Sequence, residues 1–446
     1  MTAHMTRDHR FVVDSAGHRA AQRDRRVVHV LPYRTNDFLV RMLARAFERR
    51  GLAFRAGEPV TPETLQRARS VCSGRECLAF QSLVAATHRD LATQRPAGEI
   101  SIYHGLEADG PCQCGAWPLV WEVFARRLEA RDAVFPGHPT VKNDYLGHGL
   151  GFGAELVAVM AAADVLDEAR RALPCVAQEP AGALAAFDAE ADAVVESARG
   201  GVAAVALALH RFSRRVARIP RRARLTEVPS VLVFGGGELP VLYRPVVEFL
   251  AEQGVAVKLV DLSDFMLYLE ADWMLRFAFR MGRRTVAGQF AWSRTLALAL
   301  VPGELGRAAR RALRSKLATD GGDLIVRVFK RVARESGLVH DGPVALRELV
   351  ERGDAHIPHS LHCDAITSAG RFERSVERGT YDAYVHLASV NCRPALQIQG
   401  SIRKLASDRD VTLATIDLAV PKLTPQQLRV LENVVIQAKR AKARAA

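Results

Sequence analysis

The segment that most constrains the fold is SVLVFGGGELPVLYRPVVEFLAEQGVAVKLVD at residues 230–261. A β-branched apolar run leads into three glycines, a stretch with helical spacing, a glycine stop at Gly254 and a second apolar run. This order of strand, turn, helix and strand is typical of a βαβ unit, whose two strands lie parallel in one sheet. Because a parallel sheet is covered by helices on both faces, the segment places the chain in the α/β class.

Strands and helices also alternate towards both ends of the chain. RVVHVLP (26–32) and EISIYHG (99–105) have the character of buried strands, and residues 37–52 have the spacing of an amphipathic helix. Residues 381–417 again show strand, turn, helix and strand. We therefore predict two Rossmann/flavodoxin-like parallel-sheet lobes with helical inserts and a ligand site in the cleft between them. The expected boundaries are a disordered arm at 1–25, a first lobe at 26–150, a helical connector at 151–228 and a second lobe at 229–446 with a helical insert at 262–352.

Composition and targeting signals favour a cytoplasmic globular protein. Of the 446 residues, 49% are apolar and 25% are charged, which is ordinary for a chain of two or three domains. The first 25 residues lack the apolar core of a signal peptide. The longest apolar passages contain acidic residues such as Glu155 and Asp164, so we expect core helices and no membrane span.

The net charge of +13 is concentrated at residues 211–225 and in the C-terminal tail. Such a surplus suits acidic partners, including phosphorylated cofactors, an acidic electron-transfer protein or nucleic acid. A solvated arginine-rich surface is the simpler explanation and the one that we favour. Because the sequence has no zinc finger, no RNA-binding motif and no basic stripe interleaved with aromatic residues, nucleic acid is the disfavoured partner.

Cysteines occupy places where an α/β fold carries its functional loops. The chain has seven cysteines, an odd number that fits a reducing compartment without structural disulfides. Cys77 opens a predicted helix, while Cys112 and Cys392 follow predicted strands, and open parallel sheets bind ligands at the carboxyl ends of their strands. Several cysteines in equivalent settings favour a shared metal site over a single nucleophile, and thiolates select zinc, copper(I) or iron–sulfur clusters. Spacing alone leaves ligand and core roles equally open for each of the three, whereas Cys175 is expected in the core.

Two further motifs are weaker candidates. Gly235, Gly236 and Gly237 follow a strand and open a helix, so their amides either cradle a phosphate or simply form a tight turn. The segment HIPHSLHC at 356–363 contains three histidines and Cys363. It suits a zinc or iron site, but in an extended segment the histidines alternate between two sides, which favours loop and core-edge roles.

Four segments, in order, resemble a known family. SGRECLAFQSLV (73–84), DGPCQCGAWPLVWEVFARRLE (109–129), the βαβ unit beginning at 230 and YDAYVHLASVNCRPALQIQGSIRKL (381–405) are similar to segments of the 2-hydroxyacyl-CoA dehydratase activase-related proteins and dehydratase subunits. The resemblance covers about residues 27–146 and 229–440. It implies a [4Fe-4S] or larger iron–sulfur cluster held by Cys77, Cys112 and Cys392. Cys72, Cys114 and Cys363 would supply a fourth ligand, support a larger cluster or be bystanders.

The resemblance also implies a chemistry and a partner. A single low-potential electron would reduce the carbonyl of an acyl-CoA thioester, and the resulting radical would lose a neighbouring hydroxyl. The sequence shows no actin/Hsp70-type ATP-binding segment and no Walker A pattern, so we expect a separate ATP-dependent activase or other electron donor. Arg75, Arg244 and Arg393 are candidates for holding a CoA diphosphate or docking that donor.

Three alternatives remain open from the sequence. The chain is a catalytic dehydratase or reductase component, a non-catalytic iron–sulfur carrier or assembly partner, or a metal-free binding protein of the same fold. Three protein thiolates would leave one iron of a four-iron cluster open to substrate, whereas full ligation would leave an electron carrier. Homodimeric and heterodimeric states both remain open.

Overall fold

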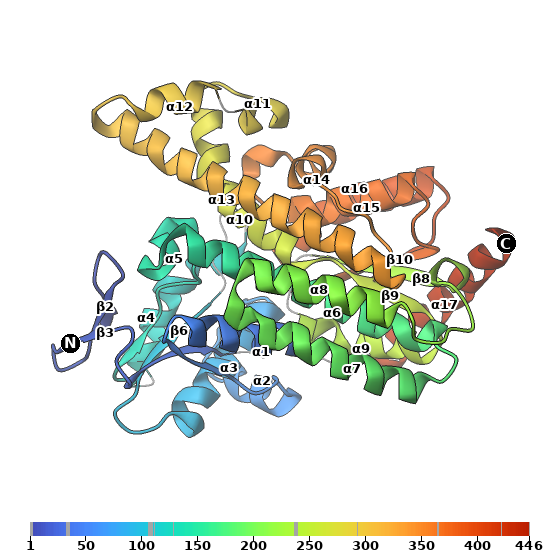
Figure 1. The fold of residues 1–446 in the computed structure, drawn as a ribbon, viewed down its shortest axis with the longest axis horizontal. Helices are drawn as coiled ribbons and strands as arrows, with labels where there is room; N and C mark the ends of the chain where they lie inside the picture. The colour runs from blue at the N-terminus through green and yellow to red at the C-terminus, as the bar shows by residue number, and fades with distance from the viewer. Residues whose placement is uncertain are drawn as a thin grey trace.

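A computed structural model shows two four-stranded parallel sheets connected by helices (Figure 1). The structure describes residues 3–32, 36–105, 110, 112–127, 129–235, 240–291, 293–363, 365–420 and 422–445. The first sheet has the order β5-β4-β6-β7, and all of its neighbouring strands pair in parallel. Its strands are β4 (Val27–Leu31), β5 (Ala53–Ala56), β6 (Ile100–Tyr103) and β7 (Ala133–Val134).

The second sheet repeats the topology of the first. Its order is β11-β10-β8-β9, again wholly parallel. If the strands of each lobe are numbered in chain order, both sheets have the order 2-1-3-4. The first strand lies between the second and the third, and the fourth lies at the edge beside the third. The predicted pair of parallel-sheet α/β lobes is confirmed. The strands are β8 (Ser230–Phe234), β9 (Ala256–Leu259), β10 (Ala383–Ser389) and β11 (Leu413–Leu418).

Helices cover the faces of each sheet, as parallel pairing requires. In the first lobe, α1 begins at the N-cap Asn36, whose side chain accepts from the Leu39 amide, and it buries Phe38, Leu39 and Met42. The helices that flank the first sheet are α1 (Asp37–Arg49), α2 (Pro62–Arg69), α3 (Leu78–Arg89) and α4 (Trp117–Arg127). Those of the second lobe are α9 (Pro240–Glu252), α15 (Ala365–Glu377), α16 (Arg393–Asp408) and α17 (Pro425–Ala445).

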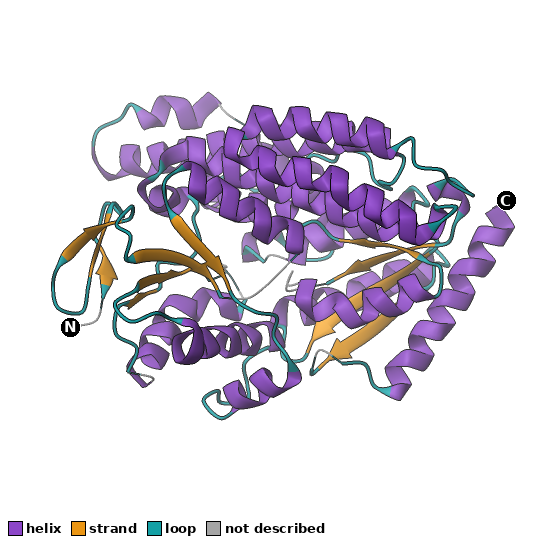
Figure 2. Ribbon diagram, turned by 60° about the horizontal axis from the view of Figure 1, so that its bottom comes forward, coloured by secondary structure: helices purple, strands orange, loops and turns teal. Residues whose placement is uncertain are grey.

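The expected connector and insert pack together as one helical layer that lies along both sheets (Figure 2). Its central helix, α6 (Gly149–Val176), packs against α1, α10 and α13. This helix is long and apolar enough to span a membrane, but 72% of its most apolar window is buried inside the protein, as in a core helix. The other helices of the layer are α7 (Pro180–Ser197), α8 (Val202–Val216), α10 (Leu262–Arg280) and α13 (Gly303–Ala333). Four shorter helices complete the chain: α5 (Asp144–Gly147), α11 (Val286–Phe290), α12 (Ser293–Ala299) and α14 (Leu346–Gly353).

The N-terminal segment differs from the disordered arm expected from the sequence. Residues 4–21 form a three-stranded antiparallel sheet of β1 (His4–Met5), β2 (Phe11–Val13) and β3 (Arg19–Ala21). Val12 and Ala20 bury their side chains in one cluster with Val27 and Ile102 of the first lobe. The strands are too short for a clear alternating pattern, so their order comes from this packing.

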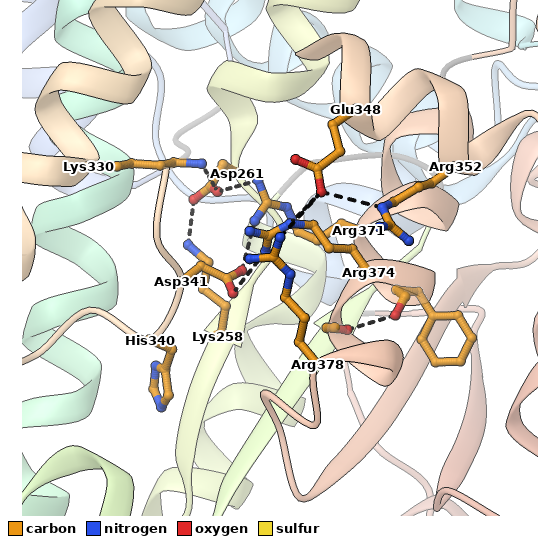
Figure 3. Close-up of polar contacts among 12 residues, drawn as sticks. Lys258, Asp261, Lys330, His340, Asp341, Glu348, Arg352, Arg371, Arg374 and Arg378 are labelled. Carbon is orange, nitrogen blue, oxygen red and sulfur yellow. Dashed lines mark hydrogen bonds and ion pairs between the residues drawn. The ribbon is translucent and has the colours of Figure 1, made fainter. Parts of the chain in front are cut away.

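A buried ionic network joins the second sheet to the helical layer (Figure 3). Asp261, just after β9, accepts from Lys258 Nζ at 2.5 Å and from Lys330 Nζ of α13 at 2.6 Å. Arg371 of α15 lies 3.2 Å from the same carboxylate and also bonds Asp341 at 2.8 Å. Burial alone would raise the pKa of Asp261, but the three cations hold it well below its usual range. The carboxylate therefore stays ionised and ties β9, α13 and α15 together.

A second buried carboxyl joins the first lobe to the helical layer. Glu270 of α10 is 3% exposed and accepts from the Val141 amide at 3.0 Å. Burial raises its pKa from 4.5 to about 7, although the hydrogen bonds from Val141 and Tyr145 act in the opposite direction. Between about pH 4.5 and pH 7, the Glu270 carboxyl therefore keeps its proton in the folded chain but loses it in the unfolded chain.

We predict that Glu270→Gln changes how stability depends on pH. Because its folded pKa is raised, the contribution of Glu270 to stability is full below about pH 4.5 and is lost as the pH rises through about 7. The wild type should lose up to about 3 kcal/mol relative to Glu270→Gln across that window. Urea unfolding at several pH values measures this difference. The exposed Glu248→Gln serves as the control, and parallel curves for wild type and Glu270→Gln would contradict the prediction.

Candidate functional site

The carboxyl ends of the two sheets face each other across the middle of the molecule (Figure 2). Cys112 lies in the connection after β6, and Cys392 lies in the connection after β10. Since β6 and β10 are the third strands of lobes with the same topology, the two cysteines follow equivalent strands. In sheets of this order, ligands bind at the carboxyl edge, where the connections from the first and third strands diverge.

Two of the three principal cysteines lie at the N-terminal ends of helices. Cys77 is the N-cap residue of α3, and Cys392 is the N-cap residue of α16, whose Pro394 fits the first turn. Both side chains are buried at 5% exposure. The positive end of a helix dipole favours negative charge at these positions, as a thiolate would supply.

Hydrogen bonds hold the three cysteine-bearing loops together. The Cys77 amide donates to Gln113 Oε1 at 2.8 Å, and Gln113 Nε2 donates to the Arg75 carbonyl at 3.2 Å. Asn391 Nδ2 lies 3.5 Å from the Gly74 carbonyl, which joins the loop after β10 to the same turn. Cys77 and Cys392 share one apolar cluster, and the half-buried Cys72 and Cys112 pack against it. Segments far apart in the sequence therefore meet at the crevice.

An open cavity of about 610 Å³ adjoins these loops. Cys112, Arg75 and Arg393 line it, together with Glu76 and Gln113. Both arginine side chains belong to exposed residues. The cavity thus combines a thiol with two guanidinium groups, which suits a ligand that carries negative charge.

The remaining candidates differ from the three principal cysteines in surroundings or in chemistry, although the main chain at 361–362, just before Cys363, lies against Gly110 of the Cys112 loop. Burial, with the nearby Glu76, raises the pKa of Cys72 to about 12, so this side chain is a thiol at neutral pH. Cys363 belongs to a different apolar cluster, and its Sγ contacts Gln397 Oε1 at 3.5 Å. Arg244 pairs with Glu248 on the surface of α9.

The histidines near Cys363 do not gather around one point. His356 pairs with Glu373 at 2.8 Å, and His359 pairs with Asp354 at 2.6 Å. His362 lies 3.5 Å from Asp272. Each histidine thus contacts a different carboxylate.

Gly235 has a steric reason to be glycine. A β-carbon there would lie 1.9 Å from the Leu387 carbonyl oxygen of the neighbouring strand, and its φ of +159° suits glycine. Close approach to β10 therefore explains this glycine, and it leaves both the phosphate-cradle and the tight-turn interpretations open. Gly236, Gly237 and the side chain of Cys114 lie outside the described part of the chain.

The cysteine loops contain no preformed site for a single metal ion among the described residues. Within the described ranges, no three His, Cys, Asp or Glu side chains are grouped so as to hold one ion. Thiolates around a single ion lie within about 2.3 Å of it, whereas a multi-iron cluster holds its cysteines further apart. The structure shows two buried thiols at helix starts, with Cys112 packed against the same apolar cluster.

Gln113 and Asn391 are site residues that the sequence reasoning missed. Each is a direct neighbour of a principal cysteine in the sequence: Gln113 follows Cys112, and Asn391 precedes Cys392. That adjacency is the only signal in the sequence, because their partners lie in the turn at 73–77. Comparison with known proteins adds no identification: no protein-family profile matches the chain, and no curated protein matches it significantly.

We predict that Gln113→Ala loosens the turn that carries Cys77. The loss of one acceptor should cost about 1 kcal/mol and raise the rate of Cys77 alkylation about five-fold. Mass spectrometry of iodoacetamide-treated protein measures this rate. Gln113→Glu keeps an oxygen for the Cys77 amide and should react much more like the wild type. Equal rates in all three proteins would show that the contact does not hold the turn.

Proposed function

We propose that the protein is an iron–sulfur protein whose cluster is held by Cys77, Cys112 and Cys392 in the crevice between the lobes. The observation that carries the proposal is the meeting of three cysteine-bearing loops at the facing carboxyl edges of two sheets with one topology. The resemblance to 2-hydroxyacyl-CoA dehydratase and activase-related proteins points to the same three residues. The activity proposed is low-potential one-electron chemistry on an acyl-CoA-type or other small substrate.

The chain's own residues would prepare the site in two ways. Cys77 and Cys392 lie at the starts of α3 and α16, where the helix dipoles would stabilise thiolates. Arg75 and Arg393 at the cavity would pair with the phosphates of a CoA substrate or with carboxylates of an electron donor. When bound through three thiolates, such a cluster supplies an open iron for a substrate oxygen and one electron at low potential. The electron would come from a separate ATP-dependent reductase.

A metal-free binding protein of the same fold is the second candidate. It is favoured by the lack, within the described residues, of three potential ligands already grouped for an ion. In that case the thiols remain core-edge residues, and the two cavity arginines alone would bind the ligand.

Anaerobic reconstitution with iron and sulfide separates these candidates. We expect the wild type to take up about four iron and four sulfide per chain and to turn brown. Cys77→Ser, Cys112→Ser and Cys392→Ser should each lose most of the cluster, because each removes one of three ligands. Cys175→Ser is the matched control, since Cys175 is buried in the helical layer away from the crevice.

Circular dichroism of the four variants shows that they are folded before metal analysis. Wild-type iron and sulfide contents in all three crevice variants would rule out the proposed ligands. A folded wild type that takes up neither element would favour the metal-free alternative.

Electron paramagnetic resonance distinguishes a catalyst from a carrier. If one iron is open, a 2-hydroxyacyl-CoA thioester should change the spectrum of the reduced cluster, because its oxygen reaches that iron. Free coenzyme A, which lacks the acyl group, is the control and should leave the spectrum nearly unchanged. A spectrum that no acyl thioester alters would indicate a fully ligated cluster that only transfers electrons.

A further inference from the structure

A second, larger cavity lies at the opposite edge of the second sheet. Its volume is about 880 Å³, and its lining includes the segment 221–227, Ser230 at the start of β8 and Thr380 shortly before β10. Because β8 and β10 are parallel, these residues mark the amino edge of the sheet, whereas Cys392 marks the carboxyl edge. The cavity is therefore separate from the cysteine crevice.

The lining of this cavity carries a large excess of positive charge. Its one carboxylate, Glu227, pairs with Arg224 at 2.5 Å, and Lys442 pairs with Asp382 at 3.1 Å. Within the described part of the chain, Arg221, Arg222 and Arg334 have no carboxylate at ion-pair distance. The cationic side chains of the lining are Arg221, Arg222, Arg224, Arg334 and Lys442.

Arg221 is fixed in position rather than extended into solvent. Its guanidinium donates to the main-chain carbonyls of Val216 at 3.2 Å and Ser336 at 2.5 Å, while its Nε is buried without a described partner. Its backbone pairs with Ala177 at the end of α6 through an antiparallel bridge. Burial lowers the pKa of Arg221, yet a guanidinium remains charged at neutral pH. A half-buried cation without an anion is unfavourable, and a bound anion would offset that cost.

His340 adds a polar atom at the wall of the cavity. Its side chain is 6% exposed, and its Nδ1 lies 3.3 Å from Glu168 Oε1. Because an ionised carboxylate only accepts, Nδ1 carries the hydrogen. Nε2 has no hydrogen-bond partner among the described residues, and Figure 3 shows the ring turned away from Asp261 and Lys330. This nitrogen can accept a hydrogen bond from a ligand hydroxyl.

We propose that this cavity binds a small molecule with a diphosphate group, of the nucleoside diphosphate or coenzyme A class. Guanidinium groups match phosphate oxygens, and three of them here lack a protein anion among the described residues. Arg221 already donates to main-chain carbonyls and supplies charge, whereas the exposed Arg222 and Arg334 can offer N–H groups to a phosphate. The volume lies within the range of about 300–1,000 Å³ that is usual for small-molecule sites and leaves room for a nucleoside beside the phosphates. The proposal is independent of the cluster and holds whether or not the crevice contains iron.

Isothermal titration of the full chain with inorganic pyrophosphate, ADP and coenzyme A tests the proposal at low ionic strength. We expect saturable binding of pyrophosphate that weakens about ten-fold or more in Arg334→Ala and in Arg221→Ala. Arg334 makes no described ion pair, so its variant keeps the test valid if Arg221→Ala fails to fold. Arg214→Ala is the control, because it removes an exposed charge from the same arginine-rich stretch outside the cavity.

The three probes also identify the source of the diphosphate. If ADP binds more tightly than pyrophosphate, the cavity recognises the nucleoside. If coenzyme A binds more tightly than ADP, the cavity also recognises the other groups of coenzyme A. Equal loss of affinity in Arg214→Ala and Arg334→Ala would overturn the proposal by showing that only net charge matters. Absence of binding by all three probes would overturn it as well, and polynucleotide binding in their place would assign the charge to a nucleic-acid surface.

Discussion

The arrangement of the second lobe depends on the buried carboxylate of Asp261. It accepts hydrogen bonds from two lysine ammonium groups and lies beside an arginine guanidinium. These three cations come from three separate elements, and the whole network is buried. Removal of one partner from such a network leaves an unpaired buried charge, at a cost of about 3–5 kcal/mol. The network thereby fixes β9 against α13 and α15. Since α6 of the same helical layer also packs on α1, the two sheets are held relative to each other, and so is the crevice between them.

Equal topology in the two lobes explains why the crevice collects functional loops. Each sheet has its first strand between the second and third, so the connections from the first and third strands part at its carboxyl edge. With the two edges facing, the loops after β6 and β10 meet the turn before α3. Neither lobe alone supplies all three cysteines, because Cys77 and Cys112 come from the first lobe and Cys392 from the second. Any ligand held by all three would also join the lobes.

Local sequence pattern was enough to predict β4, β6, the strands of the second lobe and the class of fold, but not β5. Apolar runs and glycine stops are properties of neighbouring residues, and they led to two α/β lobes. The N-terminal sheet was missed because its strands have two or three residues each and are ordered by contact with Val27 and Ile102. The network around Asp261 was also missed, since Lys258, Lys330 and Arg371 are spread over more than a hundred positions. That the cysteine loops meet followed from the predicted strand ends, whereas Gln113 and Asn391 required the coordinates.

The two edges of the second sheet carry different side chains: cysteines lie at the carboxyl edge, and a group of arginines lies at the amino edge. At the carboxyl edge, thiols and a glycine turn approach the crevice. At the amino edge, a basic segment that by composition alone suggests a solvated surface is pinned to α6 by the bridge between Ala177 and Arg221. Arg221 and Arg222 of this segment and Arg334, just after α13, line one cavity, and among the described residues no carboxylate lies at ion-pair distance from them. In the proposed role of the cavity, part of the net charge of +13 would serve a binding site, and its partner would be an anion small enough to enter.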